Sequence, residues 1–261
     1  MNPPETVASL QRGLQVLGAI QRASALSFTE LREATGLPKA TLVRLLRTLV
    51  ESGWVRRQGP RGRYVGEASP GLPAAQRSEL ARLAQRARPV FTRLQRTVPW
   101  PVNLGVREGS HMLIVDEPDT VVLGLAANYR QLGHRPPMLR SSLGLCHLAF
   151  CSEAERAGLM QRLSRSTDEL DQAVLRSGLL PQRLRDIRGR GYALRDVSVV
   201  PSDSPERYGA FAVPVMAGAH LQACLSCSWL LQIASVEETV QRCLQPMPAA
   251  ADALARQLAT G

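Results

Sequence analysis

Basic and hydroxyl side chains recur along one face of an expected helix between residues 38 and 52. Four leucines fall in one arc when successive residues are placed about 100° apart, and these are Leu42, Leu45, Leu46 and Leu49. The opposite arc carries Ala40, Thr41, Arg44, Arg47 and Thr48. The leucine arc predicts a core-facing side, and the other side can bring guanidinium groups to guanine edges. The alternative is an ordinary solvated helix face.

A second group of arginines lies on an expected hairpin directly after this helix. Residues 54–57 and 63–65 have the composition of two short strands around the turn at 58–62. The hairpin carries four guanidinium groups, from Arg56, Arg57, Arg61 and Arg63. Such groups contact the DNA backbone or the minor groove and raise affinity with little sequence choice. Simple solvation is the alternative for each of them.

The net charge of +10 belongs to the N-terminal part of the chain. Residues 1–98 contain 16 Lys and Arg against 6 Asp and Glu, whereas residues 99–261 contain 16 of each kind. A basic module beside a neutral remainder is typical of a polyanion-binding unit joined to a different domain. A solvated arginine-rich surface has the same composition, so charge alone does not decide.

Signals around the basic helix predict the elements that position it. Apolar residues at helical spacing predict a first helix from about Thr6 to Ile20. Ser27 and Glu30 match a capping box that opens a short second helix, which ends at Gly36. Pro38 suits the first turn of the basic helix, and Gly53 suits its left-handed end. Helices with a glycine-containing turn, followed by a basic hairpin, predict a winged helix-turn-helix.

The remainder of the chain predicts a connector and an α+β domain. Residues 67–74 have linker composition, and residues 78–98 return to helical periodicity with Pro89 as a possible kink. The expected domains are therefore 1–68, a linker helix at 69–98, and 99–261. Strands are expected at Val102–Val106, Met112–Asp116, Val121–Ala127, Tyr192–Asp196, Phe211–Val215 and Leu221–Trp229, and helices at Ser141–Cys151, Ser152–Leu163, Gln182–Arg190 and Val236–Leu258.

The strand expected at 221–229 places two hydroxyls on one face. With a period of two, Ser226 and Ser228 share a side with Gln222 and Cys224. Buried hydroxyls need partners, which a ligand carboxylate or neighbouring backbone can supply. The residues alone leave both interpretations open.

Several other functions lack a motif. The four histidines are dispersed, and no hydrolase elbow, zinc-protease helix or phosphate loop occurs, so neither an enzyme nor a cofactor is expected. The Cys224-x-x-Cys227 pair would point to opposite faces of a strand, which argues against a metal site. An odd number of cysteines and no leader peptide favour a cytoplasmic protein. The uncharged stretch 208–236 is broken by polar residues and a turn, and is read as a buried hairpin rather than a membrane span.

The chain resembles the IclR family of bacterial regulators across nearly its whole length. Residues 9–17 resemble the opening helix of that family, and residues 36–49 are similar to its recognition-helix signature. In the second part, residues 137–144, Arg190-Gly191-Tyr192 and residues 212–215 resemble markers of the effector domain. The stretch 148–156 is similar to MhpR-type members, which activate aromatic-acid degradation genes.

This resemblance implies a GAF-like α/β effector-binding domain with an antiparallel sheet, and a homodimer or homotetramer that binds a double-stranded DNA operator. The DNA-contacting residues would be Lys39, Ala40, Thr41, Val43, Arg44, Arg47, Arg56, Arg57, Arg61 and Arg63. The effector-binding residues would be Ser142, Leu143, Asp196, Ala210, Ser226 and Ser228.

The expected effector is a small organic acid, and an aromatic carboxylate such as a phenylpropionate is favoured. A small aliphatic keto- or hydroxy-acid, an architectural DNA binder without ligand, and an enzyme with a DNA-binding appendage are the alternatives. The unusual segment 201–205 departs from the family pattern before a strand of the pocket, which bears on ligand identity.

Overall fold

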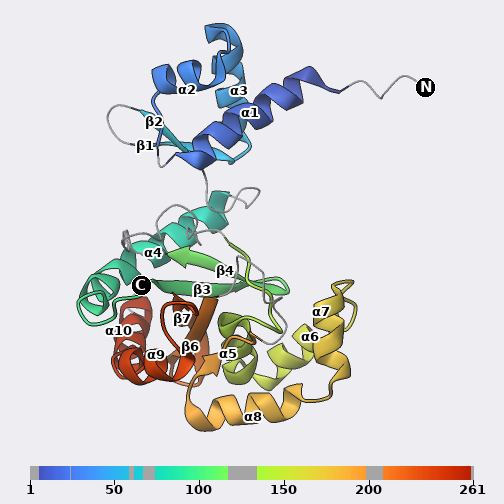
Figure 1. The fold of residues 1–261 in the computed structure, drawn as a ribbon, viewed down its shortest axis with the longest axis vertical. Coiled ribbons are helices and arrows are strands. Elements are labelled where there is room, and N and C mark those ends of the chain that lie inside the picture. Colours follow the sequence, from blue (N-terminus) through green and yellow to red (C-terminus); the bar gives the residue numbers. More distant parts are fainter. Residues whose placement is uncertain are drawn as a thin grey trace. The chain divides into compact units, whose positions relative to one another are not determined.

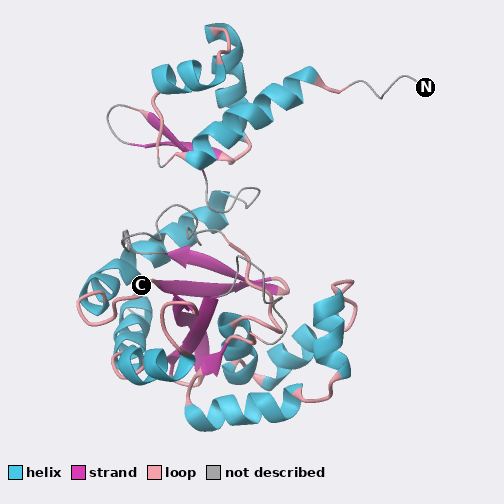
Figure 2. Cartoon of the chain, viewed as in Figure 1, coloured by secondary structure: helices cyan, strands magenta, loops and turns pink. Residues whose placement is uncertain are grey.

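The computed structural model describes residues 6–23, 25–58, 62–66, 74–116, 134–197 and 208–259. The chain divides into two compact units, Met1–Glu79 and Leu80–Gly261, and the division falls inside helix α4. Helices and strands are mixed in both units (Figures 1 and 2). Four expected features lie outside the described residues, namely Arg61 with its turn, the start of the linker, the strand at Val121–Ala127 and the segment 201–205.

In the described part of the N-terminal unit, helices are followed by a hairpin. The elements in chain order are α1 (Ala8–Arg22), α2 (Phe28–Thr35), α3 (Lys39–Glu51), β1 (Val55–Gln58) and β2 (Arg63–Gly66). The two strands are antiparallel, and Leu26 adds a bridge to Tyr64 on the outer side of β2. This arrangement is the winged helix-turn-helix that the sequence predicts.

The start and end signals of α2 are satisfied as the sequence predicts. Ser27 accepts from the Glu30 amide at 3.3 Å, and the Glu30 carboxylate accepts from the Ser27 amide at 2.6 Å. Gly36 ends the helix with φ of 66°, a left-handed conformation that glycine adopts without a Cβ clash. Pro38 differs from the prediction by one position, because it lies just before α3 rather than in its first turn.

The core of this unit forms where α1, α2 and α3 meet. Its fully buried members come from each helix and from β1, and they are Val16, Ile20, Leu31, Leu42, Leu46 and Val55. Each such side chain contributes about 1.5–3 kcal/mol by leaving water. Leu45 and Leu49 pack against the same cluster, so the leucine arc of α3 is its core-facing side.

Replacement of Ser27 tests how much its cap stabilises α2. Ser27→Ala removes the acceptor for the Glu30 amide, which costs about 1 kcal/mol. We expect amides of α2 to exchange with deuterium about fivefold faster in the full-length variant. Thr29→Ala, at an exposed position in the same turn, is the control and should leave exchange unchanged. Equal protection in Ser27→Ala and wild type would show that the cap contributes nothing.

The C-terminal unit builds an antiparallel sheet between helical layers. Its strands are β3 (Val102–Glu108), β4 (His111–Asp116), β5 (Ala193–Leu194), β6 (Tyr208–Ala217) and β7 (His220–Leu230). Its helices are α5 (Ser142–Phe150), α6 (Glu153–Leu163), α7 (Glu169–Arg176), α8 (Leu180–Arg190), α9 (Val236–Cys243) and α10 (Met247–Ala259), and α4 (Ala74–Leu94) precedes them.

The described strands of this unit pair in the order β4-β3-β7-β6-β5. The longest pairing joins β6 and β7 through a turn at Gly218, so the uncharged segment is the hairpin that the sequence predicts. None of the described helices is long and apolar enough to cross a bilayer.

The two faces of this sheet pack against different helices (Figure 1). Helix α5 lies on one face and contacts β5, β6 and β7, and α8 packs on α5. Residues 142–149 of α5 are all buried, which explains why this helix is apolar around its whole circumference. On the other face α10 contacts β6 and β7.

Two expected elements of this unit need correction, and one helix was not predicted. The single helix expected at Val236–Leu258 is two helices, because Pro246 has no amide hydrogen and interrupts the helical hydrogen bonds. The strand expected at Tyr192–Asp196 pairs only over Ala193–Leu194. Helix α7 was not predicted; it begins where the Asp168 carboxylate accepts from two backbone amides.

Candidate nucleic-acid interface and effector site

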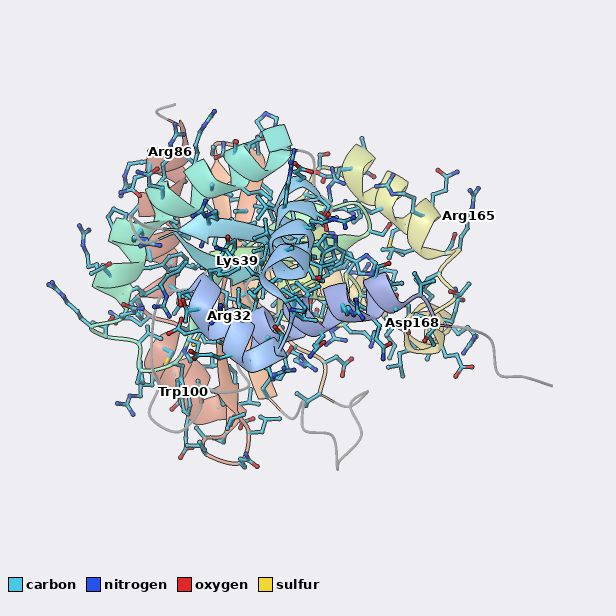
Figure 3. The ribbon with its side chains drawn as sticks, turned by 90° about the horizontal axis from the view of Figure 1, so that it is seen from above. Arg32, Lys39, Arg86, Trp100, Arg165 and Asp168 are labelled. Atoms are coloured by element: carbon cyan, nitrogen blue, oxygen red, sulfur yellow. The ribbon has the colours of Figure 1, made fainter. Side chains whose placement is uncertain are left out.

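The outward side of α3 is the candidate DNA-reading surface. Lys39, Arg44 and Arg47 are exposed, and Thr41 is half-buried between them and the core; Figure 3 labels Lys39 on this helix. Ala40 is exposed, and so is Val43 at 48%. Since Leu42 and Leu46 hold the opposite side in the core, the polar side is fixed toward solvent. A helix presented in this way fits the major groove.

Arg44 and Arg47 differ in what holds them. The Arg47 Nε donates to Glu51 Oε1 at 2.7 Å, one turn along the same helix. This hydrogen bond and the Glu51 charge raise the pKa of Arg47 above its ordinary value. To bind a phosphate or a base, Arg47 must therefore break its ion pair with Glu51 or bind both partners at once. Arg44 forms no ion pair with any of the described residues. Arg44 is the stronger candidate for direct base contact.

Two arginines of the hairpin are exposed to solvent, whereas a third forms hydrogen bonds within the N-terminal unit. Arg56 and Arg57 are exposed on β1, and the Arg57 guanidinium lies 5.6 Å from the centre of the Tyr64 ring. Arg63 instead donates to the Ala25 carbonyl at 2.7 Å and to Glu30 at 2.9 Å. The pKa of Glu30 is lowered by the hydrogen bond from Ser27 and by Arg63. Arg63 thus ties the hairpin to the start of α2, a role that the sequence did not reveal.

In the C-terminal unit, the N-terminus of α5 carries Ser142 and Leu143, the first two candidate effector residues. Ser141 caps the helix by accepting from the Gly144 amide at 3.0 Å. The amides of Ser142 and Leu143 come earlier, where helix geometry provides no intrahelical acceptor. Leu143 covers Gly105 of β3, since a Cβ there would lie 2.9 Å from its methyl groups. Unpaired amides above an apolar floor favour a carboxylate with an apolar body.

The sheet face under α5 holds three more of the candidates. Strand pairing places Ser226 beside Ala212 and Asn103, and Ser228 beside Ala210. The Asn103 amide donates to the Ser228 hydroxyl at 3.2 Å. These side chains are nearly inaccessible, with Ala210 at 6% and Ser226 at 3% exposure. The structure therefore brings Ser226, Ser228 and Ala210 together on the face that α5 covers.

Asp196 joins this group through the backbone. Its amide donates to the Arg140 carbonyl at 3.1 Å, directly before the cap of α5, and the preceding amide donates to Ala210. Its carboxylate pairs with Arg183 of α8, which offsets the negative charge. Backbone hydrogen bonds thus connect Asp196 to the segment that leads into α5, and connect its neighbour Arg195 to Ala210.

An ion-pair network from α7 holds the same end of α5. Arg140 donates to Asp171 at 2.9 Å and to Asp168 at 2.7 Å; Asp168 is labelled in Figure 3. The backbone hydrogen bond from Asp171 and the charge of Arg140 lower the pKa of Asp168. This network was not predicted, because both carboxylates belong to the start of α7, a helix that the sequence did not reveal.

The cysteines are buried free thiols rather than a paired site. Cys224 belongs to the core under α5, whereas Cys227 neighbours Cys243 of α9, so the two strand cysteines point to opposite faces as the sequence predicts. Burial raises the pKa of Cys146 well above its ordinary range.

His147 contacts Glu155 where α5 ends and α6 begins. The His147 Nε2 and Glu155 Oε1 atoms are 3.0 Å apart, and Arg107 donates to the same carboxylate at 2.7 Å.

Two family models match the chain, and together they span both units. The IclR helix-turn-helix domain matches residues 9–59, and the C-terminal domain of the bacterial transcriptional regulator IclR matches residues 76–256. The second match alone covers more than half of the chain.

The chain belongs to the IclR family.

Similar proteins and solved structures extend this match. The acetate operon repressor of Salmonella typhimurium is 30% identical over 195 residues, which cover 73% of this chain and 69% of the relative. A putative transcriptional regulator from Rhodococcus shares the fold with a TM-score of 0.60 and 21% identity, covering 98% of this chain and 99% of that one. An IclR homologue from Microbacterium hydrocarbonoxydans, solved with 4-hydroxybenzoate, has a TM-score of 0.55 and 22% identity, covering 97% and 100%.

Membership of the IclR family settles the class of function. The chain is a DNA-binding transcriptional regulator rather than an enzyme, with a helix-turn-helix unit and an α/β unit built on an antiparallel sheet.

Proposed function

We propose that the outward side of α3 reads the operator in the major groove, with Arg44 as the main base contact. Lys39, Thr41 and Arg47 flank it, and Ala40 and Val43 supply apolar contact to bases or sugars. Arg56 and Arg57 on the hairpin contact the backbone or the minor groove. Two further DNA contacts complete the proposal: Arg61, which lies outside the described residues, and Arg63, through the guanidinium nitrogens that its internal hydrogen bonds leave available.

The regulator acts as a homodimer or a dimer of dimers. Support comes from α1, whose apolar stripe is buried only in part: Leu17 and Ile20 lie in the core, while Leu10 and Leu14 are 61% and 58% exposed. Exposed leucines one turn apart favour contact with a second copy. Two recognition helices related by symmetry read a pseudo-palindromic operator.

The effector is a small organic acid bound at the N-terminal end of α5. One observation carries this proposal: α5, which opens with unpaired amides and the apolar Leu143, covers a sheet face that holds two buried hydroxyls and Ala210. The amides and hydroxyls suit a carboxylate, and the apolar side chains suit an aromatic body. The 4-hydroxybenzoate bound by a relative of the same fold supports an aromatic acid, as does the resemblance to the MhpR-type branch. A small aliphatic keto- or hydroxy-acid is the second candidate.

Removal of both hydroxyls tests the effector site. Ser226→Ala combined with Ser228→Ala should abolish or strongly reduce the rise in melting temperature that the binding acid produces in full-length protein. Binding to operator DNA should persist, because the substitutions lie outside the N-terminal unit. The acid is found by screening aromatic and aliphatic carboxylates against wild type.

The matched control is Ser164→Ala, which removes an exposed hydroxyl from the same unit. This variant should respond to the acid as wild type does. An unaltered titration in the double variant would rule out these hydroxyls as ligand contacts.

A further inference from the structure

Three side chains that can bind a metal converge where α5 ends and α6 begins. A ring nitrogen of His147, the Cys151 sulfur and a Glu155 carboxylate oxygen all lie within 4.8 Å of one another. His147 and Cys151 are each 5% exposed, and Glu155 is half-buried. This cluster contains none of the residues assigned to the effector, and it lies at the opposite end of α5 from Ser142 and Leu143.

Local hydrogen bonds hold the three residues at a tight corner. Cys151 caps the C-terminal end of α5, where its amide donates to the His147 carbonyl one turn earlier. Ser152 then opens α6 by accepting from the Glu155 amide at 3.2 Å, which turns the carboxylate back toward α5. Arg156 donates to the carbonyls of Leu148 and Cys151, both at 3.3 Å, and closes the corner. The donor atoms are thus positioned by the backbone before any ligand arrives.

The donor set matches the preference of one class of ion. Zn²⁺ binds cysteine sulfur, histidine nitrogen and carboxylate oxygen with bonds of about 2.0–2.3 Å, and sites with three protein ligands keep a water in the fourth position. Tetrahedral geometry with those bonds separates donor atoms by about 3–4 Å. His147 Nε2 and Glu155 Oε1 already lie 3.0 Å apart. The C-terminus of α5 also favours a cation through the helix dipole.

An ion-pair network is the competing explanation for this cluster. Arg107 Nε lies 2.7 Å from the Glu155 oxygen that contacts His147, and Arg107 also donates to the Gly109 carbonyl. The Arg107 side chain is 37% exposed, so it can move into solvent and release the carboxylate. An ion-pair network does not explain why Cys151 lies beside these groups. The Cys151 thiol has only a weak contact with the Leu148 carbonyl at 3.8 Å. A metal site uses all three side chains.

We propose that His147, Cys151 and Glu155 bind a divalent first-row metal ion of the Zn²⁺ class, with water as the fourth ligand. The Cys151 thiol passes its proton to solvent as the sulfur–metal bond forms, and no electron is transferred. The inference goes beyond the effector proposal and does not depend on it. The sequence alone predicted no metal site, because the strand cysteines Cys224 and Cys227 point to opposite faces.

Cobalt substitution tests the site in untagged, reduced, full-length protein freed of metal with a chelator. Titration with Co²⁺ should give one equivalent bound, a sulfur-to-cobalt charge-transfer band and the visible bands of tetrahedral coordination. Added Zn²⁺ should displace the cobalt and bleach both. Cys151→Ser should lose the charge-transfer band and weaken binding at least about tenfold. Cys243→Ala, which removes a buried cysteine on α9, is the control and should keep the band.

Glu155→Gln gives a second test at a half-buried position in case Cys151→Ser does not fold. This variant keeps the shape of the side chain but should weaken Co²⁺ binding at least about tenfold. Absence of a charge-transfer band in wild type, or an equal band in Cys151→Ser, would overturn the proposal. Unchanged affinity in Glu155→Gln would do the same. Operator binding is measured separately, so a failed metal site is distinguishable from a failed regulator.

Discussion

Arg44→Ala should lower specific operator affinity by about 1–3 kcal/mol, as expected for the loss of a bidentate contact between arginine and guanine. The reason is geometric, because the leucine side of α3 is locked into the core and Arg44 points to solvent with no recorded ion pair among the described residues. Affinity for random duplex DNA should change much less, since one phosphate contact at most is lost. The measurement is the ratio of specific to non-specific binding, with an operator selected from random duplexes.

The matched control for this substitution is Arg22→Ala. Arg22 is an exposed arginine in the last turn of α1, in the same unit but outside the recognition surface. Arg22→Ala removes the same charge as Arg44→Ala, so it should change the affinity for operator and for random duplex by similar, small amounts. If Arg44→Ala and Arg22→Ala reduced specific binding equally, Arg44 would act only through its charge.

Gly144→Ala should destabilise the C-terminal unit by about 1–3 kcal/mol and weaken acid binding together with it. A Cβ at this position would overlap the backbone of Met138, including its carbonyl oxygen, and backbone yields less readily than a flexible side chain. Helix α5 would have to shift at the end that carries Ser142 and Leu143. Urea unfolding of the full-length protein measures the loss, followed by tryptophan fluorescence in a Trp54→Phe background so that Trp100 and Trp229 report on this unit.

Gly158→Ala is the control because it makes the same chemical change inside a helix with room for it. The nearest atom to its Cβ would be an Arg162 nitrogen at 3.8 Å, an ordinary contact. Removing a helical glycine should stabilise α6 by up to about 1 kcal/mol. Destabilisation of equal size in both variants would contradict the argument from close approach at Gly144.

Local signals in the sequence predicted much of the fold. The capping box at Ser27, the leucine arc of α3 and the alternation in β6 and β7 each depend on neighbouring residues, and the structure contains all three. The helix α7 escaped prediction because it spans only two turns, too short for a clear apolar period, and begins at a single capping carboxylate, Asp168.

The sites were harder to predict than the fold, because they depend on contacts between residues that are distant in the sequence. Arg63 reads as another hairpin arginine until its ion pair with Glu30, more than thirty residues earlier, is seen. Likewise Asp196 acquires its partner Arg183 only when α8 folds onto the sheet. The spacing of His147, Cys151 and Glu155 at intervals of four was visible in the sequence, but the corner between two helices was needed to bring Glu155 back.

The most direct test of the central claim is the binding of purified full-length protein to a duplex covering its own promoter, measured by gel retardation over a range of salt concentrations. The structure predicts a retarded complex at low ionic strength whose affinity falls steeply with salt, by about 0.9 logarithmic units per tenfold salt for each phosphate contacted. Arg44→Ala should bind more weakly at every salt concentration. No retardation at low ionic strength, or a complex indifferent to Arg44, would contradict the assignment of α3 as the DNA-reading helix.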